Sequence, residues 1–388
     1  MMHRATNQPS DNAEALHTFL LSTSFPRDSL DWRGVFIRHI VDAISRIHDI
    51  HLSVWAPPGE LPAEATSVIT SREASWLTRL MAAGGISHLM RSGGVGALFA
   101  PLRLLLMIGA AYRRQREVDI YHINWLQCAL PLPNNGKPAL ITVLGNDLKL
   151  LRLPMMRQCL RRIMQNRRVA ICPNAEWMYE PLYAAFGDCA DIIPVSFGID
   201  PRWYAIQRAS TGGTPRRWLV VTRLTADKLG PLFEWSQEYF RNGSRELHLF
   251  GPMQEDVKVP DWVHYHGAAT PEQLTSDWFP NACGLITLSR HSEGRPQVML
   301  EAMAASLPII ASRMPAHSSI VDQHRTGMLC DSPEAYLAAL ETLEDPVVNC
   351  EFGEAARAKV EREMGTWDDC AGRYVSIYRK LTGTHTGE

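Results

Sequence analysis

The sequence predicts an α/β protein made of two doubly wound domains, each a parallel sheet with helices on both faces. Short β-branched or aromatic runs alternate with helical runs along most of the chain, which is typical of parallel α/β sheets. A length of 388 residues suggests two domains rather than one. A break near residues 201–214 contains Ala-Ser-Thr-Gly-Gly-Thr and is typical of a linker. Ligands of open sheets bind beyond the carboxyl ends of the strands, so two facing domains predict a substrate cleft between them.

The expected elements divide between the two halves of the chain. In the first half the strand-like runs are His17–Ser24, Ile50–Ala56, Asp119–Trp125, Ala139–Leu144, Arg168–Cys172 and Asp191–Val195. In the second half they are Trp218–Thr222, Leu247–Phe250, Val263–His266, Gly284–Leu288 and Ile309–Ala311. Helical spacing is found in stretches such as Val35–Ile47 and Gln297–Ala305. We expect a first domain over 1–200, a linker over 201–214, a second domain over 215–365, and a C-terminal helix over 366–388 that packs back on the first domain.

Composition narrows the class of protein. A hydrophobic content of 46% and a charged content of 21% are those of a soluble globular protein. The net charge of −2 excludes a strongly basic nucleic-acid binder. The eight cysteines form no Cys-x-x-Cys pair, so we expect reduced thiols rather than a disulfide framework or a zinc site. Residues 16–25 lack the basic lead-in and the cleavage site of a signal peptide, so we expect a cytoplasmic protein.

The most informative stretch follows the strand-like run Gly284–Leu288. It reads Ser-Arg-His-Ser-Glu-Gly-Arg-Pro-Gln-Val-Met-Leu-Glu-Ala-Met-Ala, and its two glutamates, Glu293 and Glu301, are eight positions apart. Pro296 suits the first turn of a helix, whose first amides have no partner within the helix. Such a helix start attracts a phosphate, and the glutamates add acceptors for sugar hydroxyls. A nucleotide sugar carries both groups. The alternative is a surface capping box with solvated glutamates.

A second constellation follows the run Trp218–Thr222. Arg223 and Lys228 are five positions apart there, and Gly230 is close behind. An arginine fork and a lysine point charge can converge on one pyrophosphate. The alternative is a pair of solvated surface charges.

These segments resemble the retaining glycosyltransferases of family 4 (glycosyl transferases group 1), which have the GT-B fold of two Rossmann-like domains. The resemblance rests on the Glu293–Glu301 spacing with Glu-Ala-Met-Ala, on Arg223-Leu224 followed by Lys228, and on Phe250-Gly251-Pro252. It implies that Arg223, Lys228 and Glu293 are catalytic, with Glu301 on the ribose, Glu293 on the transferred sugar, and the two cations on the donor phosphates. The rest of the implied donor site is Gly34, Thr222, Gly251, Ser289, His291, Gly294, Arg295, Gln297 and Val298.

Two departures from the family pattern accompany the second constellation. Thr222 stands where glycine is usual, and Leu229 separates Lys228 from Gly230. Ser306, after the helix that contains Glu301, also replaces a usual glycine.

The first half matches the family more loosely. Gly34 ends a loop that the resemblance places near the sugar phosphate and the acceptor. Arg27, Asp31 and Arg33 in the same loop are candidate acceptor contacts, with solvated loop charges as the alternative. His122, in a family-like Asp-x-x-His strand, is a candidate acceptor contact or a core histidine.

The clearest mismatch is Leu144. Family members often have a histidine there, and leucine can neither donate nor accept a proton. Either Asn146 or Asp147 takes over the polar contact of the missing histidine, or the donor-site groups alone support the reaction.

Two basic and apolar stretches lie in the first half. Val95–Arg116 is strongly apolar with arginines at its end, and Pro101 and Arg103 make it marginal as a membrane span. Lys149–Arg168 carries seven basic residues and no acidic one, interleaved with apolar residues. Basic amphipathic helices lie on anionic membranes, so both stretches are candidate membrane surfaces. An ordinary packed helix with a solvated basic face is the alternative.

The sequence thus predicts a retaining, metal-independent glycosyltransferase with no cofactor. Its donor would be a nucleotide diphosphate-sugar and its acceptor a glycan or lipid-linked molecule, as in bacterial surface polysaccharide or lipopolysaccharide assembly. We expect it in the cytoplasm or peripherally on the inner face of the cytoplasmic membrane. The rivals are a GT-B sugar-nucleotide 2-epimerase, which needs no acceptor, and a non-catalytic GT-B scaffold.

Overall fold

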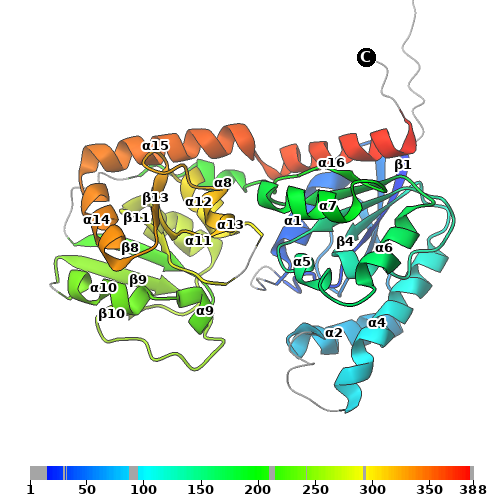
Figure 1. Ribbon diagram of the computed structural model, residues 1–388, viewed down its shortest axis with the longest axis horizontal. Helices are drawn as coiled ribbons and strands as arrows, with labels where there is room; N and C mark the ends of the chain where they lie inside the picture. Colours follow the sequence, from blue (N-terminus) through cyan, green and yellow to red (C-terminus); the bar gives the residue numbers. More distant parts are fainter. Residues whose placement is uncertain are drawn as a thin grey trace, which may run out of the picture. The chain divides into compact units, whose positions relative to one another are not determined.

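Two parallel sheets organise the computed structural model (Figure 1). It describes residues 15–28, 31, 33–86, 95–208, 215–241, 243–291 and 294–384, without the side chains of residues 95–98. The first sheet has seven strands in the order β3-β2-β1-β4-β5-β6-β7, and the second has six in the order β10-β9-β8-β11-β12-β13. Helices alternate with parallel strands along most of the chain, so the predicted α/β class is confirmed.

The first sheet is built from the first half of the chain. Its strands are β1 (Leu16–Leu21), β2 (Ile50–Trp55), β3 (Ala65–Ser67), β4 (Ile120–Asn124), β5 (Ala139–Val143), β6 (Val169–Pro173) and β7 (Asp191–Ile192). The helices between them are α1 (Val35–Ser45), α2 (Ser71–Ala82), α4 (Val95–Arg114), α5 (Asp147–Leu150), α6 (Met156–Met164) and α7 (Tyr179–Phe186). Strands β4, β5 and β6 are buried along their whole length, as expected for a sheet covered on both faces.

The second sheet is built from the second half. Its strands are β8 (Arg216–Val221), β9 (Arg245–Phe250), β10 (Val263–Tyr265), β11 (Gly284–Thr287), β12 (Ile309–Ser312) and β13 (Gly327–Cys330). The helices of this half are α8 (Pro201–Tyr204), α9 (Ala226–Leu229), α10 (Leu232–Phe240), α11 (Pro271–Gln273), α12 (Gln297–Ala304), α13 (Pro315–Ser318), α14 (Pro333–Leu343), α15 (Pro346–Glu363) and α16 (Trp367–Thr382).

Each strand-like run of the sequence overlaps an observed strand. Two further strands, β3 and β13, were not expected. The three residues of β3 lie at a sheet edge, where pairing with β2 rather than local pattern makes them a strand. Strand β13 begins at Gly327 and pairs in parallel with β12 at the other end of the second sheet.

Two apolar clusters cover the opposite faces of the second sheet. One packs Leu219 and Leu285 with Met299 and Met303 of α12, and the other contains Trp218, the residue before Leu219 in β8. Because successive strand residues point to opposite faces, the apolar run of β8 supplies both clusters. Helix α12 is thereby fixed under the sheet, with its first turn at the carboxyl end of β11.

The stretch Lys149–Arg168 is not one helix, which corrects the sequence interpretation. Helix α5 ends at Leu150, α6 begins at Met156, and Met155 has a left-handed backbone with φ 59°. Val95–Arg114 does form one helix although it contains Pro101. Among the described residues, no helix combines the length and the apolar character needed to cross a bilayer.

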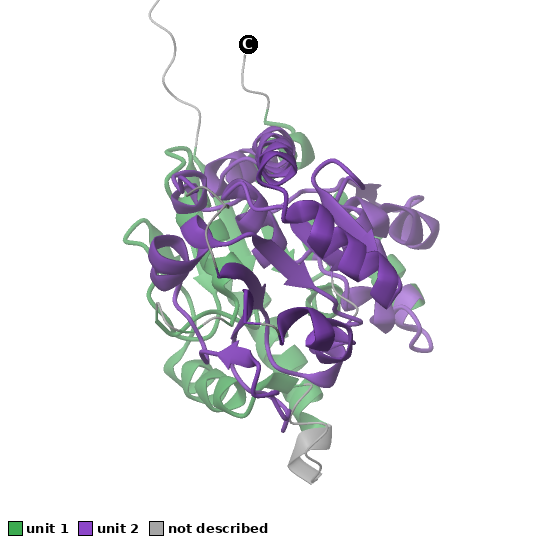
Figure 2. Cartoon of the chain, turned by 90° about the vertical axis from the view of Figure 1, so that its left-hand side faces the viewer, with its two compact units in different colours: residues 1–142, 158–170, 374–388 green, residues 143–157, 171–373 purple. Residues whose placement is uncertain are grey.

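The chain divides into two compact units, coloured green and purple in Figure 2. Unit 1 comprises residues 1–142, 158–170 and 374–388, and unit 2 comprises 143–157 and 171–373. Within unit 1, the last turns of α16 pack on the first sheet, where Arg379 forms an ion pair with Asp49 at 2.6 Å. The boundaries predicted at 200, 214 and 365 stay a prediction.

Candidate functional site

The two motifs of the second half meet at the carboxyl ends of neighbouring strands of the second sheet. Strands β8 and β11 are neighbours, and residues 222–230 follow the first while Ser289 and its successors follow the second. The amide of Arg290 donates a hydrogen bond of 2.7 Å to the carbonyl oxygen of Asp227. Segments about sixty residues apart are therefore in contact at the carboxyl ends of parallel strands, where open α/β sheets bind ligands.

Gly230 makes that contact possible. Its φ is +54°, and a Cβ there would lie 2.1 Å from the carbonyl oxygen of Leu288. No other residue type fits so close an approach without displacing one segment. Leu229, one of the departures from the family pattern, is buried in the apolar core beside this turn. The extra residue thus anchors the turn while Gly230 meets the neighbouring loop.

Gly251 packs against the backbone of Thr222, the other departure from the family pattern. Its φ is +138°, and a Cβ there would lie 1.7 Å from the carbonyl oxygen of Thr222. The amide of Thr222 also donates to the carbonyl oxygen of Phe250 at 2.9 Å. The close packing between these two loops therefore needs glycine at position 251.

The candidate cations lie on the loop after β8 and on α9. Arg223 Nη1 donates to Gln254 Oε1 at 3.3 Å, and both Arg223 and Lys228 are partly buried. Thr225 caps α9 by accepting from the Lys228 amide at 3.2 Å. The cap fixes the backbone from which the Lys228 side chain extends.

The loop after β11 begins with a tight turn. Ser289 Oγ accepts from the His291 amide at 3.1 Å, and the Ser289 carbonyl accepts from Ser312 Oγ at 2.6 Å. Glu293 lies outside the described residues, so its predicted contact with the transferred sugar stays a prediction.

Gly294 is held from one side by residues that the sequence interpretation missed. Trp177 Nε1 donates to the Gly294 carbonyl at 2.8 Å. A Cβ at 294 would lie 2.5 Å from Asn174 Oδ1 and 2.9 Å from the Gly145 amide nitrogen. No local signal joins position 294 to residues over a hundred positions earlier. Only the folded chain shows this contact.

The side chains of Arg295 and Gln297 hold the segment before α8. Arg295 Nη1 donates to Ser196 Oγ at 2.6 Å, and Gln297 Nε2 donates to the Gly198 carbonyl at 2.8 Å. Burial lowers the pKa of the Arg295 guanidinium. These side chains therefore have structural contacts, and the predicted phosphate donors there are backbone amides. Val298 packs against the apolar core.

Glu301 lies one turn into α12, next to α8. Burial, together with the charge of Asp200 and against that of Arg202, raises its carboxyl pKa to about 7. Its residue surface is partly accessible, and among the described residues its carboxylate has no hydrogen-bond partner. A carboxyl group with a strongly shifted pKa and no partner is typical of a binding site.

Asp31 and Arg33, two candidate acceptor contacts of unit 1, bind each other. Arg33 Nε donates to Asp31 at 2.8 Å and Arg33 Nη2 at 3.0 Å, while Arg33 Nη1 reaches the Met81 carbonyl at 2.6 Å. Arg27 is exposed and pairs with Asp28 at 3.1 Å. Gly34 is the N-cap residue of α1, with φ 72°. The Asp31–Arg33 pair shapes the loop, which leaves Arg27 as its most accessible cation among these candidates.

His122 is a core histidine in this structure. It is fully buried, with its ring nitrogens 2.5 Å from the Tyr378 hydroxyl and 2.9 Å from Thr142 Oγ1. Burial lowers its pKa to about 3. Both nitrogens are engaged in joining β4 and β5 to α16, so the acceptor role considered for His122 is not supported.

The segment after Leu144 uses Asp147 for its own turn. Asp147 is buried and accepts from the Leu144 amide at 2.8 Å. Asn146 is exposed. Of the two polar residues considered as substitutes for the missing histidine, Asn146 is the accessible one.

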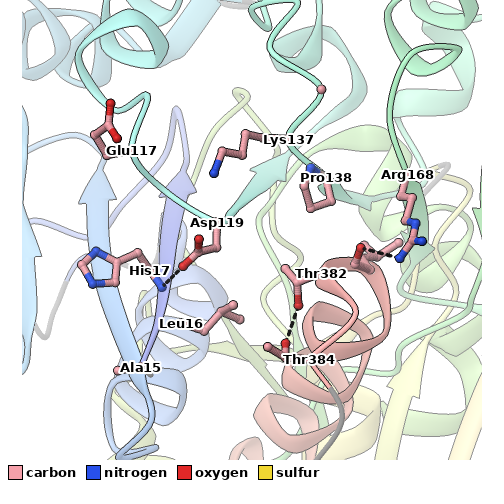
Figure 3. A pocket seen from close by; sticks show the side chains of 12 residues that line it. Ala15, Leu16, His17, Glu117, Asp119, Lys137, Pro138, Arg168, Thr382 and Thr384 are labelled. Carbon is pink, nitrogen blue, oxygen red and sulfur yellow. Dashed lines mark hydrogen bonds between the residues drawn. The ribbon is translucent and has the colours of Figure 1, made fainter. Parts of the chain in front are cut away.

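A separate cavity of about 710 Å³ lies in unit 1 (Figure 3). Leu16, Asp119, Pro138 and Arg168 line it, and they stand at the amino ends of β1, β4, β5 and β6. Asp119 Oδ2 accepts there from the His17 amide at 2.9 Å. Because ligands of parallel sheets bind at the carboxyl ends, this cavity is not the predicted donor site.

Comparisons with known proteins agree with the motifs. Residues 234–345 match the family described as glycosyl transferases group 1. A D-inositol 3-phosphate glycosyltransferase of Pseudarthrobacter chlorophenolicus is 28% identical over 149 residues, which cover 38% of this chain and 34% of that protein. The match thus spans about a third of the length of that relative.

Solved structures match over nearly the whole chain. Sucrose-phosphate synthase from Thermosynechococcus elongatus aligns with a TM-score of 0.68 and 14% identity, covering 95% of this chain and all of that one (100%). Anabaena HepE in complex with UDP-glucose aligns with a TM-score of 0.64 and 13% identity. The alignment covers 94% of this chain and 100% of that one. The chain therefore has the GT-B fold, and over residues 234–345 it matches the glycosyl transferases group 1 family.

Proposed function

We propose that the protein is a retaining glycosyltransferase. It transfers a sugar from a nucleoside diphosphate-sugar to a hydroxyl group of a glycan or lipid-linked acceptor, without a metal ion or other cofactor. We propose a role in bacterial surface polysaccharide or lipopolysaccharide assembly, on the cytoplasmic side of the membrane. The Arg290–Asp227 hydrogen bond carries the proposal, because it joins the cationic segment to the loop that leads to Glu293 and Glu301.

The donor's diphosphate has two sources of positive charge at this edge of the sheet. Arg223 and Lys228 are cationic side chains, and the amides of Arg295, Gln297 and Val298 lie at the start of α12. Charge that develops on the departing diphosphate is stabilised where such groups are already oriented. This electrostatic role needs no covalent intermediate.

The sugar hydroxyls of the donor would donate hydrogen bonds to the two glutamates. Glu301 has a carboxylate with no partner among the described residues, and ribose hydroxyls would donate to it. Glu293 would contact the transferred sugar. The acceptor hydroxyl would attack the anomeric carbon on the face from which the diphosphate leaves, and its proton would pass to the departing phosphate oxygen. Retention follows from that same-face attack.

The first donor to test is UDP-glucose. HepE was solved with it, and the matched family is one of glycosyltransferases. The experiment is a thermal-shift screen of UDP, GDP and their sugars, followed by NMR of the product formed from the stabilising donor. We expect one nucleoside diphosphate to raise the melting temperature and the new linkage to keep the donor's anomeric configuration.

Three outcomes would contradict the proposal. An inverted product would exclude retention. Formation of an epimer from the donor alone would identify a 2-epimerase. Absence of stabilisation by every nucleoside diphosphate would favour a scaffold without donor binding.

A further inference from the structure

Helices α2 and α4 of unit 1 lie next to each other (Figure 1). Residues of both helices line an apolar cavity. Its volume is about 380 Å³, and its apolar lining includes Trp76, Leu80 and Phe99. Arg79 and Arg103 also line it, and the Arg103 guanidinium lies over the Trp76 ring at 5.1 Å from the centroid. The cavity therefore combines apolar walls with two cations, a pairing suited to an amphiphile with an anionic head group.

The outer face of α4 is apolar as well. Phe99, Leu102 and Leu106 are 63%, 56% and 64% exposed, and their spacing places them on one side of the helix. The inner side of the helix is buried, with Leu104 and Ile108 in the core. Helix α4 thus has more apolar surface than packing within unit 1 uses. Exposed apolar surface of this kind marks an interaction site.

The charge around this surface selects an anionic partner. Within 71–116, the described residues include six arginines and one acidic residue, Glu73. Glu73 is already neutralised, since Arg114 lies 2.8 Å from it and its carboxylate also accepts from the Thr70 amide at 2.9 Å. A second copy of this chain would bring the same positive charge to the contact. An anionic lipid surface complements it and also accepts the apolar stripe.

We propose that α2 and α4 dock the protein on a membrane of anionic phospholipids. Phe99, Leu102 and Leu106 enter the interface, and one lipid places its acyl chain in the cavity and its phosphate at Arg79 and Arg103. This docking goes beyond the transfer reaction and does not depend on the donor site. It would hold unit 1 on the surface where a lipid-linked acceptor resides.

The test is co-sedimentation of the full chain with vesicles of phosphatidylcholine alone or mixed with phosphatidylglycerol. We expect binding to the mixed vesicles only, weakened by high salt. Leu106→Asp and Arg103→Glu should each weaken it at least tenfold. Val347→Asp and Arg362→Glu are the matched controls, because Val347 is a 67% exposed apolar residue and Arg362 a 64% exposed arginine side chain, both on α15. Circular dichroism melting checks that every variant is folded.

A second measurement tests the cavity itself. Monomeric dihexanoyl phosphatidylglycerol should raise the melting temperature of the wild type and not that of Arg103→Glu. Equal binding to neutral vesicles, or unchanged binding by Leu106→Asp, would overturn the proposal. A concentration-dependent dimer in analytical ultracentrifugation that Leu106→Asp abolishes would assign the surface to a second copy instead. None of these readouts uses a donor sugar, so their failure is separate from failure of the proposed transfer reaction.

Discussion

The amide of Arg290 lies 2.7 Å from the carbonyl oxygen of Asp227, and this hydrogen bond joins the segments that follow β8 and β11. Next to it, Gly230 leaves no room for a side chain, since a Cβ there would lie 2.1 Å from the Leu288 carbonyl oxygen. Two loops that each contain half of the proposed donor site are thus held in one arrangement before any ligand binds. A binding site formed in advance loses less conformational entropy when the ligand arrives.

Gly230→Ala tests that arrangement. The new Cβ would meet the Leu288 carbonyl at 2.1 Å with φ at +54°, so we expect the two segments to separate. Nucleoside diphosphate affinity, measured by calorimetry, should fall at least tenfold. Gly243→Ala is the matched control, because φ there is +74° and nothing lies within 4 Å of the added carbon. Equal loss of affinity in both variants would show that backbone strain alone, rather than separation of the segments, is responsible.

Glu301→Gln tests the ribose contact and has a pH signature. The folded-state pKa of about 7 is above the ordinary value of 4.5, so the folded protein holds a proton there that the unfolded chain releases between those values. Stability from this group is therefore complete below about pH 4.5 and is lost as the pH rises through 7.

Glu301→Gln removes the buried charge. At pH 8 its free energy of unfolding should therefore exceed that of the wild type by on the order of 1–3 kcal/mol. Near pH 4.5 the free energies of unfolding of the variant and the wild type should be equal. Donor transfer should fall at least tenfold, because the amide is a weaker acceptor than a carboxylate. Glu361→Gln, on the exposed side of α15, should change neither property. Full activity of Glu301→Gln would remove Glu301 from the donor site.

Trp177→Phe tests the support of the Gly294 loop. The change removes the 2.8 Å hydrogen bond to the Gly294 carbonyl and keeps most of the ring's volume. Loss of one such bond is worth about 1 kcal/mol, so transfer should slow about fivefold while nucleoside diphosphate binding changes less. Tyr183→Phe, on α7 at 54% exposure, is the control. If the change lowered nucleotide affinity more than turnover, the Gly294 loop would not act mainly at the transferred sugar.

Ser306 occupies a backbone position suited to glycine. Its φ is +59°, just after α12, and a left-handed residue with a side chain costs about 1–2 kcal/mol. Ser306→Gly should therefore be as stable as wild type or slightly more so in urea unfolding, whereas Ser306→Val should lose at least about 1 kcal/mol. Ala305→Gly, where φ is −80°, should also lose stability. A stable Ser306→Val variant would show that this turn relaxes.

Chelation tests the predicted independence from metal ions. With Arg223 and Lys228 neutralising the donor phosphates, transfer should continue unchanged in excess EDTA. The measurement is the initial rate before and after chelation, followed by addition of magnesium or manganese. A rate that disappears with EDTA and returns with the metal would contradict the prediction.

The sequence by itself determined the fold class and indicated the proposed donor motifs. Strand periodicity, Pro296 and the spacing of the two glutamates are local signals, and the two parallel sheets and the GT-B likeness confirm the fold that they predicted. The departures Thr222 and Leu229 were also visible, but the contacts of these residues were not. Leu229 reaches the apolar core and Thr222 lies against Gly251 only after the chain has folded.

Only the tertiary structure decided which polar side chains are already engaged. Asp31 and Arg33 bind each other, Asp147 holds its own turn, and His122 joins strands to α16. Local pattern cannot tell a ligand-binding group from a structural one, because the partner stands elsewhere in the chain: Tyr378 lies 256 positions from His122. The same holds for Trp177 at Gly294, since a hydrogen bond between distant segments depends on distance in space and leaves no periodicity in the sequence.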